Sequence, residues 1–164
     1  EPADTWQKAS HWAIDGEVPR REIPRLLDYA RNARWGTHLR TWERSAGGDG
    51  QKHPTAFVHF KKHGLREMEL RTLEEYNQAL ISLLRRADRD VYLAIHKKEH
   101  PYPVLVFRDD RTQETAVINL KGQQVATFFK SNNKKFDELR IRHNIFLKLD
   151  KARGLMKWIR FMPI

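Results

Sequence analysis

The chain has 164 residues, of which 40% are hydrophobic, 32% are charged and none is cysteine. This is the composition of a globular domain, and it excludes a disordered tail, a disulfide framework, a cysteine zinc site and a thiol nucleophile. No apolar stretch approaches the roughly 18 residues that span a bilayer, so we expect no membrane insertion. The first residue is Glu1 and not Met, so we expect the chain to be cut from a longer protein.

The formal net charge of +10 is unevenly distributed along the chain. Residues 1–50 hold 8 basic and 8 acidic side chains, residues 51–120 hold 12 and 10, and residues 121–164 hold 11 and 3. The last quarter therefore contributes +8 of the excess, which is 11 minus 3. A one-sided basic region is typical of proteins that bind polyanions, so it favours nucleic acid as a partner over a simple bias of composition.

Residues 1–50 are predicted to be a helical N-terminal segment. Asp4 can cap a short first helix, and a second helix is expected over about residues 22–44. Residues 46–50 (AGGDG) then read as a flexible connector, where the charge balance also changes. We place a domain boundary there, with residues 51–164 as an α+β domain, although the first part is short enough to pack on the second.

Two helices are expected directly after this connector. The segment TAFVHFKKHG, residues 55–64, predicts a short helix that Gly64 stops. Thr72 and Glu75 have the spacing of a capping box, and the helix that they open carries a leucine-rich face and ends near Arg86.

Strand signals take over after this second helix. Closely spaced β-branched or aromatic runs favour an antiparallel meander over residues 91–95, 104–107, 115–120 and 124–129. A further helix is expected from Asn133 to Arg153, and a last short strand over residues 156–161. The predicted fold class is α+β, with N-terminal helices, a small twisted antiparallel sheet and a further C-terminal helix.

One motif invites a metal hypothesis. His96 to His100 (HKKEH) match the H-x-x-E-H string of the inverted zinc proteases, which works only on a helix. Here the string follows a strand pattern and Pro101 comes immediately after it, so we expect a hairpin rim and no metal site. Phosphate-binding glycine loops do not occur in this sequence, and we expect no cofactor. The G-x-S-x-G nucleophile elbow does not occur either, so we do not expect acyl transfer.

The helix over residues 55–64 carries the strongest chemical signal. Phe57 and Phe60 can anchor it while Lys61, Lys62 and His63 point elsewhere at its C-terminal end. An imidazole beside two ammonium groups suits phosphodiester chemistry, because it exchanges a proton near neutral pH while the cations favour a phosphorane. The same helix end also attracts cations for structural reasons, so spacing alone leaves both interpretations open.

A tight hairpin downstream provides the second signal. Strict alternation along its second strand puts Val125, Thr127 and Phe129 on one face, and Ala126 and Phe128 on the other. The Thr127 hydroxyl can contact a phosphate, and one of the two phenylalanines can stack on a base. Core packing is the alternative for at least one of these rings.

Taken together, these pieces resemble the colicin D type of ribonuclease toxin, in the barnase–EndoU–colicin–RelE superfamily. The best local matches are residues 60–63 (FKKH) and residues 122–130 (GQQVATFFK), within a similarity over about residues 55–131. The resemblance implies a metal-independent endoribonuclease that cuts tRNA and forms the C-terminus of a bacteriocin or contact-dependent toxin. Such a toxin is secreted or delivered from the cell surface, acts in the target-cell cytoplasm and is inhibited by a cognate immunity protein, here expected to be acidic.

Carried over by position, the resemblance implies that His63 is the catalytic histidine and Lys62 the lysine before it. Thr127 or Ala126 falls where the colicin has a functional serine. The colicin has a further lysine where this chain has Phe60, so Lys61 can substitute for it only in a different geometry.

We therefore expect transesterification of RNA to a 2′,3′-cyclic phosphate and a 5′-hydroxyl. His63 would be the general base or acid, Lys61 and Lys62 would stabilise the phosphorane, and Thr127 would position a phosphate oxygen. The second proton-transfer group is left open among His59, His96 and His100, which also count as RNA-binding residues. The other residues predicted to bind RNA are Lys121, Phe128, Lys130, Lys134, Lys135, Arg140 and Arg142.

Two other functions fit the same sequence. A non-catalytic nucleic-acid-binding domain would use the basic C-terminal helix, and a protein-interaction module would place its basic face on an acidic partner. The role of residues 1–46 stays open under every interpretation.

Overall fold

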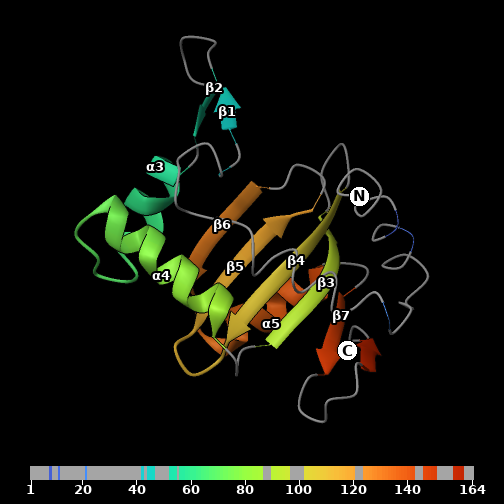
Figure 1. Cartoon of the computed structure of the whole chain (residues 1–164). Helices are drawn as coiled ribbons and strands as arrows, with labels where there is room; N and C mark the ends of the chain where they lie inside the picture. The colour runs from blue at the N-terminus through green and yellow to red at the C-terminus, as the bar shows by residue number, and fades with distance from the viewer. Residues whose placement is uncertain are drawn as a thin grey trace.

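The computed structural model describes residues 42, 44–46, 52–54, 56–86, 90–96, 102–120, 124–142, 146–150 and 157–160, and the single residues Lys8, His11 and Arg21. A small hairpin of β1 (Arg44–Ala46) and β2 (Lys52–Pro54) precedes helix α3 (Ala56–His59), which continues into the π-helical turn η3 (Phe60–Gly64). Helix α4 (Leu73–Arg85) follows, and the rest of the described chain forms one sheet and helix α5 (Asn133–Arg142) (Figure 1).

The sheet has the strand order β6-β5-β4-β3-β7-β8, and every neighbouring pair is antiparallel. The expected meander is confirmed as β3 (Asp90–His96), β4 (Tyr102–Asp109), β5 (Glu114–Asn119) and β6 (Gln124–Lys130). After β6, helix α5 leads the chain back to the other side of β3, where β7 (Phe146–Asp150) and β8 (Lys157–Arg160) complete the sheet. The α+β fold class is therefore as the sequence predicted.

The sheet is covered on both faces, by α4 on one and α5 on the other (Figure 1). The α4 face buries the larger cluster, in which Tyr76 and Leu80 of the helix pack with Leu93, Phe107 and Phe128 of the strands. The α5 face buries a smaller cluster around Phe136, composed of Tyr92, Ala94, Val104, Val106, Val117 and Ala126. Both faces of β3 and β4 are buried, which explains why these strands read as continuous apolar runs.

The start of α4 follows its sequence signal closely. The Thr72 hydroxyl accepts from the Glu75 amide at 3.1 Å, and the Glu75 carboxylate accepts from the Thr72 amide at 3.0 Å. This is the reciprocal capping box, and the helix ends at Arg85, beside the predicted Arg86.

The predicted C-terminal helix is wrong in its second half. It was expected to run from Asn133 to Arg153, but α5 ends at Arg142 and residues 146–150 form β7. The backbone of β7 pairs with β3, more than 50 residues earlier in the chain, and this long-range pairing overrides the local helical pattern. The last short strand is confirmed as β8.

Most of the predicted N-terminal helices lies outside the described residues, although Lys8 and His11 are helical. The expected end of the second helix, at Arg44, is wrong, because Arg44 begins β1 and Trp42 forms a parallel bridge with Val125. The glycine-rich connector falls between the paired strands β1 and β2. Trp42 is fully buried in the α4-face cluster, so the part of the chain before the connector contributes to the core.

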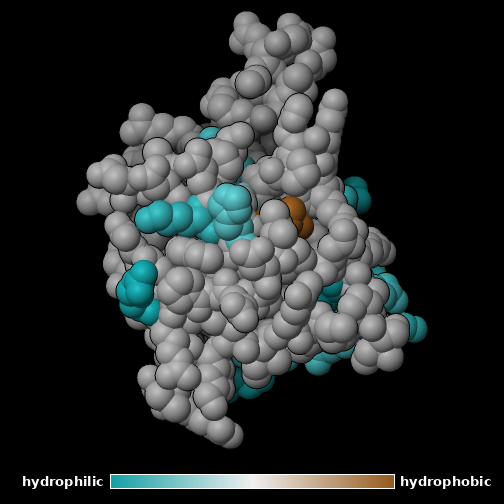
Figure 2. Space-filling model, turned by 90° about the vertical axis from the view of Figure 1, so that its right-hand side faces the viewer, coloured by the Kyte–Doolittle hydropathy of each residue, from teal (hydrophilic) through white to brown (hydrophobic). Residues whose placement is uncertain are grey.

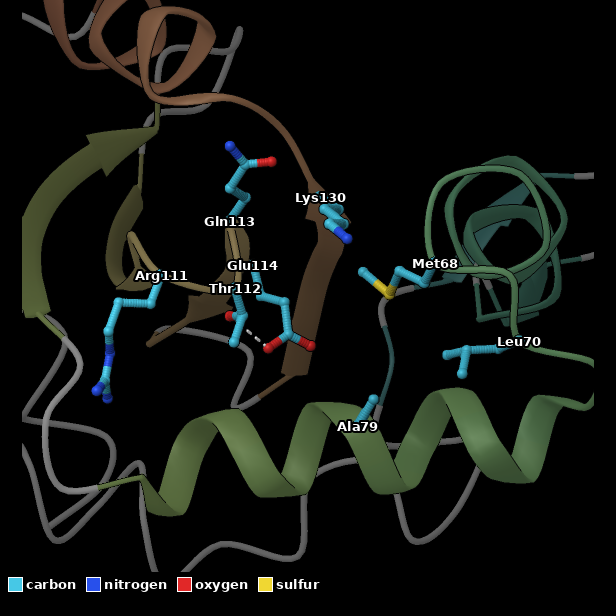
Figure 3. Close-up of a pocket in the computed structure, with 8 residues that line it drawn as sticks. All are labelled: Met68, Leu70, Ala79, Arg111, Thr112, Gln113, Glu114 and Lys130. Carbon is cyan, nitrogen blue, oxygen red and sulfur yellow. Dashed lines mark hydrogen bonds between the residues drawn. The ribbon is translucent and has the colours of Figure 1, made fainter.

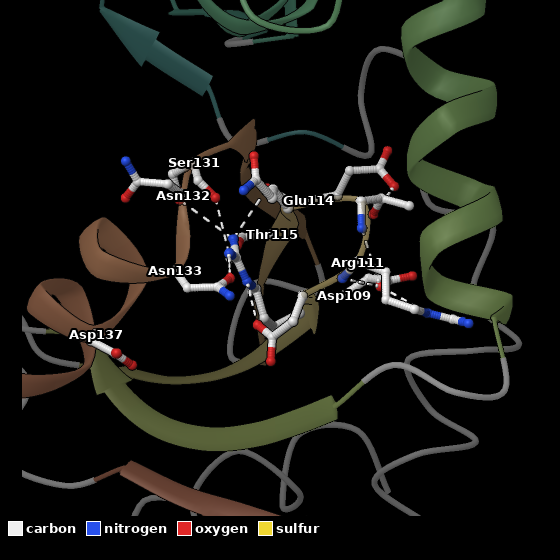
Figure 4. Close-up of polar contacts among 12 residues, drawn as sticks. Asp109, Arg111, Glu114, Thr115, Ser131, Asn132, Asn133 and Asp137 are labelled. Carbon is white, nitrogen blue, oxygen red and sulfur yellow. Dashed lines mark hydrogen bonds and ion pairs between the residues drawn. The ribbon is translucent and has the colours of Figure 1, made fainter.

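Helix α5 is held to the sheet by a buried arginine, Arg108 of β4, which has an exposed fraction of 0%. Its guanidinium donates to the Thr115 hydroxyl at 2.9 Å, to the Ser131 carbonyl at 2.9 Å and to the Asn133 side chain at 2.8 Å (Figure 4). The guanidinium also lies 4.7 Å from the centre of the Phe136 ring. The α5 end of β6 is therefore fixed by an almost completely satisfied polar cluster.

None of the helices that the structure describes combines the length and the apolar composition needed to cross a membrane. On the face shown in Figure 2, the described residues that reach the surface are hydrophilic apart from one small hydrophobic area. The exposed large apolar side chains of the described part lie on or next to α3 and η3, and are Phe57, Val58 and Leu65. Of the two predicted anchors of this helix, only Phe60 packs on the core, while Phe57 is 47% exposed.

Candidate active site

The α3–η3 helix lies along the outer edge of β6, the last strand of the sheet (Figure 1). His59 Nδ1 lies 3.1 Å from the Thr127 hydroxyl, and the His63 ring packs on Phe129 with 5.8 Å between ring centres. Four helical residues rise by about 6 Å, which nearly equals the advance of two strand residues. The i, i+4 spacing of the histidines therefore matches the i, i+2 spacing of their partners on the strand.

The two imidazoles lie side by side. The His59 and His63 ring centres are 5.6 Å apart with an interplanar angle of 16°. Of the three histidines left open for the second proton-transfer role, the structure describes His59 and His96, and it brings His59 next to His63. His96 ends β3, which β4 and β5 separate from β6, so its backbone lies about 14 Å from that strand.

A carboxylate that the sequence analysis did not select completes this group. Glu67 Oε2 lies 2.9 Å from His63 Nδ1, and Glu67 Oε1 accepts from the Lys130 amide at 2.9 Å. The His63–Glu67 contact is a close ion pair without the angle of a linear hydrogen bond. It nevertheless favours a proton on Nδ1, so Nε2 is the nitrogen that is left to exchange a proton with a substrate. The i, i+4 spacing of these residues was a signal that could have found Glu67.

Aromatic side chains support the pair from the core side. The Trp42 ring stacks on His59 with 5.9 Å between ring centres, and Tyr76 stacks on Trp42 at 5.6 Å. The Tyr76 hydroxyl donates to the Phe128 carbonyl, on the edge of β6 between Thr127 and Phe129. Burial, and then the negative charge of Glu67, raise the pKa of Tyr76, so this hydroxyl stays a donor.

Gly64 brings the helix close to this aromatic group. A Cβ atom at Gly64 would lie 2.6 Å from Phe60 Cδ1 and 2.9 Å from Tyr76 Cδ1. The backbone at Gly64 is not left-handed, and the Leu65 amide donates to the Phe60 carbonyl five residues back. Gly64 does end the helix, but the physical reason is close packing and not the left-handed cap that the sequence suggested.

The predicted alternation along β6 is wrong because the strand contains a bulge. Val117 pairs with Thr127 whereas Ile118 pairs with Val125, so Ala126 is an extra residue on β6. Val125 and Phe128 consequently share the α4 face, and the bulge leaves Thr127 facing His59. Ala126 packs on the α5 face, so Thr127 is the residue whose hydroxyl reaches the histidine pair.

Phe128 cannot stack on a base, contrary to its predicted role in RNA binding. Its exposed fraction is 0%, and its ring packs 5.1 Å from that of Tyr76. Phe129 is only partly buried and contacts His63, so it is the aromatic residue of this strand at the site.

Lys61 and Lys62 are both exposed, but they do not occupy equivalent positions. Lys61 is midway in sequence between His59 and His63, whose rings stack on one side of the helix, so Lys61 lies about half a turn from both, whereas Lys62 is adjacent to His63 and lies at the flank of the pair. Lys62 can therefore flank a phosphate at the pair, whereas Lys61 lies on the opposite side of the helix.

Only some of the cations predicted to bind RNA lie in one part of the structure. Lys130, Lys134 and Lys135 are exposed at the end of β6 and the start of α5, next to the Glu67 contact. Arg140 is further along α5 and pairs with Asp137 at 3.3 Å. Arg142 is the last residue of α5, and Lys121 and His100 lie outside the described residues.

Within the described part of the chain, no group of three or more His, Asp or Glu is placed to hold a metal ion. His96 belongs to a strand, as expected, and not to the helix that an H-x-x-E-H site requires. The chain matches no protein-family model, no curated protein and no solved structure, so the site has to be judged on its own geometry.

Proposed function

We propose that this chain is a metal-independent endoribonuclease whose centre is the histidine pair on the edge of β6. The observation that carries the proposal is the parallel packing of His59 and His63 beside the Thr127 hydroxyl. Two adjacent imidazoles can supply both proton transfers of a phosphodiester transesterification.

His63 is the general base of the first step. Its Nε2 takes the proton of the RNA 2′-hydroxyl while the 2′-oxygen forms a bond to the adjacent phosphorus. Glu67, 2.9 Å from Nδ1, stabilises the imidazolium that results. Within the described residues His63 Nε2 makes no hydrogen bond, which leaves it available to substrate.

His59 is the general acid. In the imidazolium form of His59, Nδ1–H donates to the Thr127 hydroxyl oxygen, and Nε2–H gives its proton to the departing 5′-oxygen, which leaves a neutral imidazole. The phosphorus–5′-oxygen bond breaks, and the products are a 2′,3′-cyclic phosphate and a 5′-hydroxyl. Lys62 is the cation of this helix best placed to stabilise the phosphorane.

The substrate and the biological setting rest on the resemblance to colicin D-type toxins and on the basic last quarter of the chain. The proposal accordingly includes tRNA as substrate, delivery as part of a larger toxin to the cytoplasm of a target cell, and an acidic immunity protein as partner. No metal and no cofactor are required by this mechanism.

The test is incubation of total tRNA with the pure chain in excess EDTA, beside His63→Ala. We expect discrete fragments with 2′,3′-cyclic phosphate ends from the parent, and a rate lower by about 10²–10⁴-fold in the variant. Lys61→Ala removes a cation of the same helix from its opposite side, so it serves as a matched control and should keep the fragments. Unchanged cleavage by a folded His63→Ala variant would contradict the assignment.

One specific observation favours a second function, a non-catalytic RNA- or DNA-binding domain. Lys130, Lys134 and Lys135 are exposed next to one another at the turn between β6 and α5. This alternative predicts that tRNA is bound but stays intact. The logarithm of the affinity for tRNA would fall linearly with the logarithm of the salt concentration, with a slope of about −0.7 to −0.9 for each phosphate contacted.

A further inference from the structure

A groove opens next to the histidine pair and is not used by the mechanism above. It has a volume of about 410 Å³ and lies between the connection from η3 to α4, helix α4 itself and the turn from β4 to β5 (Figure 3). This volume is within the range of small-ligand sites. Figure 3 shows Met68 and Leu70 projecting from one wall towards Glu114 and Lys130 on the other.

The walls of the groove are bonded directly to the candidate active site. The Met68 amide donates to the His63 carbonyl at 3.1 Å, and the Leu70 amide donates to the Gly64 carbonyl at 2.9 Å. On the other wall, the Lys130 amide donates to Glu67, whose second oxygen pairs with His63. Lys130 is three residues from Thr127 along β6, or about 10 Å. A nucleic-acid strand bound at the histidines can therefore reach the groove with its neighbouring nucleotide.

The lining of the groove has the chemistry of a base site. Met68, Leu70 and Ala79 provide an apolar surface for a flat ring. The Gln113 side chain has no hydrogen-bond partner among the described residues, and its amide offers both a donor and an acceptor to a base edge. The Lys130 ammonium has no ion-pair partner in the described part of the chain, so it can meet a phosphate.

The backbone of Gln113 is unusual and firmly held. Its φ angle is 64°, in the left-handed region where glycine is the least strained residue. Its amide donates to the Asp109 carbonyl at 2.7 Å, and its carbonyl accepts from the Ser131 amide at 2.9 Å. The backbone of Gln113 is therefore held in place at the rim of the groove, in a conformation that glycine would adopt with less strain.

We infer that this groove binds the unpaired base of the nucleotide next to the scissile phosphate, with the Gln113 amide reading the base edge. The inference rests on the proposed ribonuclease function, because only that function places a scissile phosphate at the histidine pair beside the groove.

The experiment titrates the full chain with each of the four ribonucleoside 3′-monophosphates, which hold no 5′-leaving group and so are not cleaved. The readout is the methyl signal of Met68, which is one of 3 methionines, in a methyl-labelled protein. We expect one nucleotide to shift this signal most strongly, and its affinity to fall about five- to tenfold in Gln113→Gly. Glycine fits the left-handed backbone, so this variant folds at least as well as the parent; Gln113→Asn tolerates the same backbone, keeps a shorter amide and should bind with intermediate affinity.

Equal affinities in the parent and Gln113→Gly, or a Met68 signal that no nucleotide shifts, would overturn the inference. Cleavage of tRNA in EDTA separates this failure from a failure of the proposed function. If tRNA is cut but Gln113→Gly changes neither nucleotide binding nor the fragment pattern, the base site alone is wrong. If tRNA stays intact while nucleotide binding depends on Gln113, the ribonuclease proposal is wrong and the groove binds a nucleotide for another purpose.

Discussion

Two polar clusters of opposite character lie on the sheet. The Arg108 guanidinium is fully buried, and each of its nitrogens donates to a carbonyl, a hydroxyl, a carboxylate or an amide oxygen of the protein. The histidine pair is partly exposed at the sheet edge, with His63 12% exposed and its Nε2 without a partner among the described residues. A satisfied buried cluster fixes a fold, whereas a positioned imidazole with an unused nitrogen, such as His63, is available for chemistry. The comparison predicts that the first cluster governs stability and the second governs activity.

Replacement of Arg108 should have the largest effect on stability. Arg108→Met would leave the buried Thr115 hydroxyl, the half-buried Ser131 carbonyl and the exposed Asn133 side chain without this donor. We expect the free energy of unfolding to fall by about 3–5 kcal/mol, measured by urea denaturation. Arg108→Lys keeps the charge but not the planar fork, so it should be intermediate. A loss below about 1 kcal/mol would show that the cluster is not structural.

Replacement of His59 should affect activity and leave stability nearly unchanged. His59→Asn keeps a polar atom near the Nδ1 position for Thr127 but cannot transfer a proton. We expect the rate of tRNA cleavage to fall by about 10²–10³-fold, with a change in the free energy of unfolding of less than about 1 kcal/mol. Thr127→Val, which removes only the hydroxyl, is the matched variant and should cost about tenfold in rate. Full activity of folded His59→Asn would remove His59 from the mechanism.

The sequence predicted the parts of this site that depend on local signals. The capping box of α4 and the strand runs of the meander are short-range patterns, and their elements formed as expected. His63 was selected from the residues of its own helix, and Glu67 is four residues away on the same turn, so local spacing contained that contact as well.

What the sequence could not predict are the contacts that close long loops. Thr127 meets His59 across 68 residues of chain, and the strand pattern predicted a role for the Thr127 hydroxyl without identifying His59 as its partner. The choice between Phe128 and Phe129 depended on the bulge at Ala126, which has no signal in an alternating strand. The strand β7 was mistaken for helix because its partner β3 lies far away in the sequence.

Gly64 is a position where one substitution should lower both stability and activity. Gly64→Ala would press a methyl group against ring carbons of Phe60 and Tyr76, whose rings pack in or against the core. We expect a loss of about 1–3 kcal/mol in thermal or urea unfolding, as for other overpacked interiors. Because Tyr76 also holds the Phe128 carbonyl on the edge of β6, cleavage per folded molecule should fall as well. A destabilised variant with full specific activity would show that the helix can shift without moving the histidines.

The smallest expected effect is on the pH dependence of stability, through the carboxyl group of Asp109. Burial raises the pKa of Asp109, but hydrogen bonds from Arg86 at 2.7 Å and from the Arg111 and Thr112 amides outweigh it, so the net pKa lies below its ordinary value. A carboxyl with a lowered pKa stabilises the fold above its unfolded pKa of about 3.9, and this stability is lost as the pH falls through the lower folded pKa.

Asp109→Asn should therefore cost about 1 kcal/mol at neutral pH, and the difference from the parent should shrink as the pH falls below the unfolded pKa and disappear once it is below the lower folded pKa. Urea denaturation of both proteins across this range measures it. Glu114→Gln removes the other carboxylate that pairs with Arg86, at 2.9 Å, and is the matched control for the loss of a negative charge. Because Glu114 receives no backbone amide hydrogen bond from the described residues, unlike Asp109, its replacement should cost less. An Asp109→Asn difference that persists unchanged at pH 2 would mean that packing, and not the charge of Asp109, stabilises this turn.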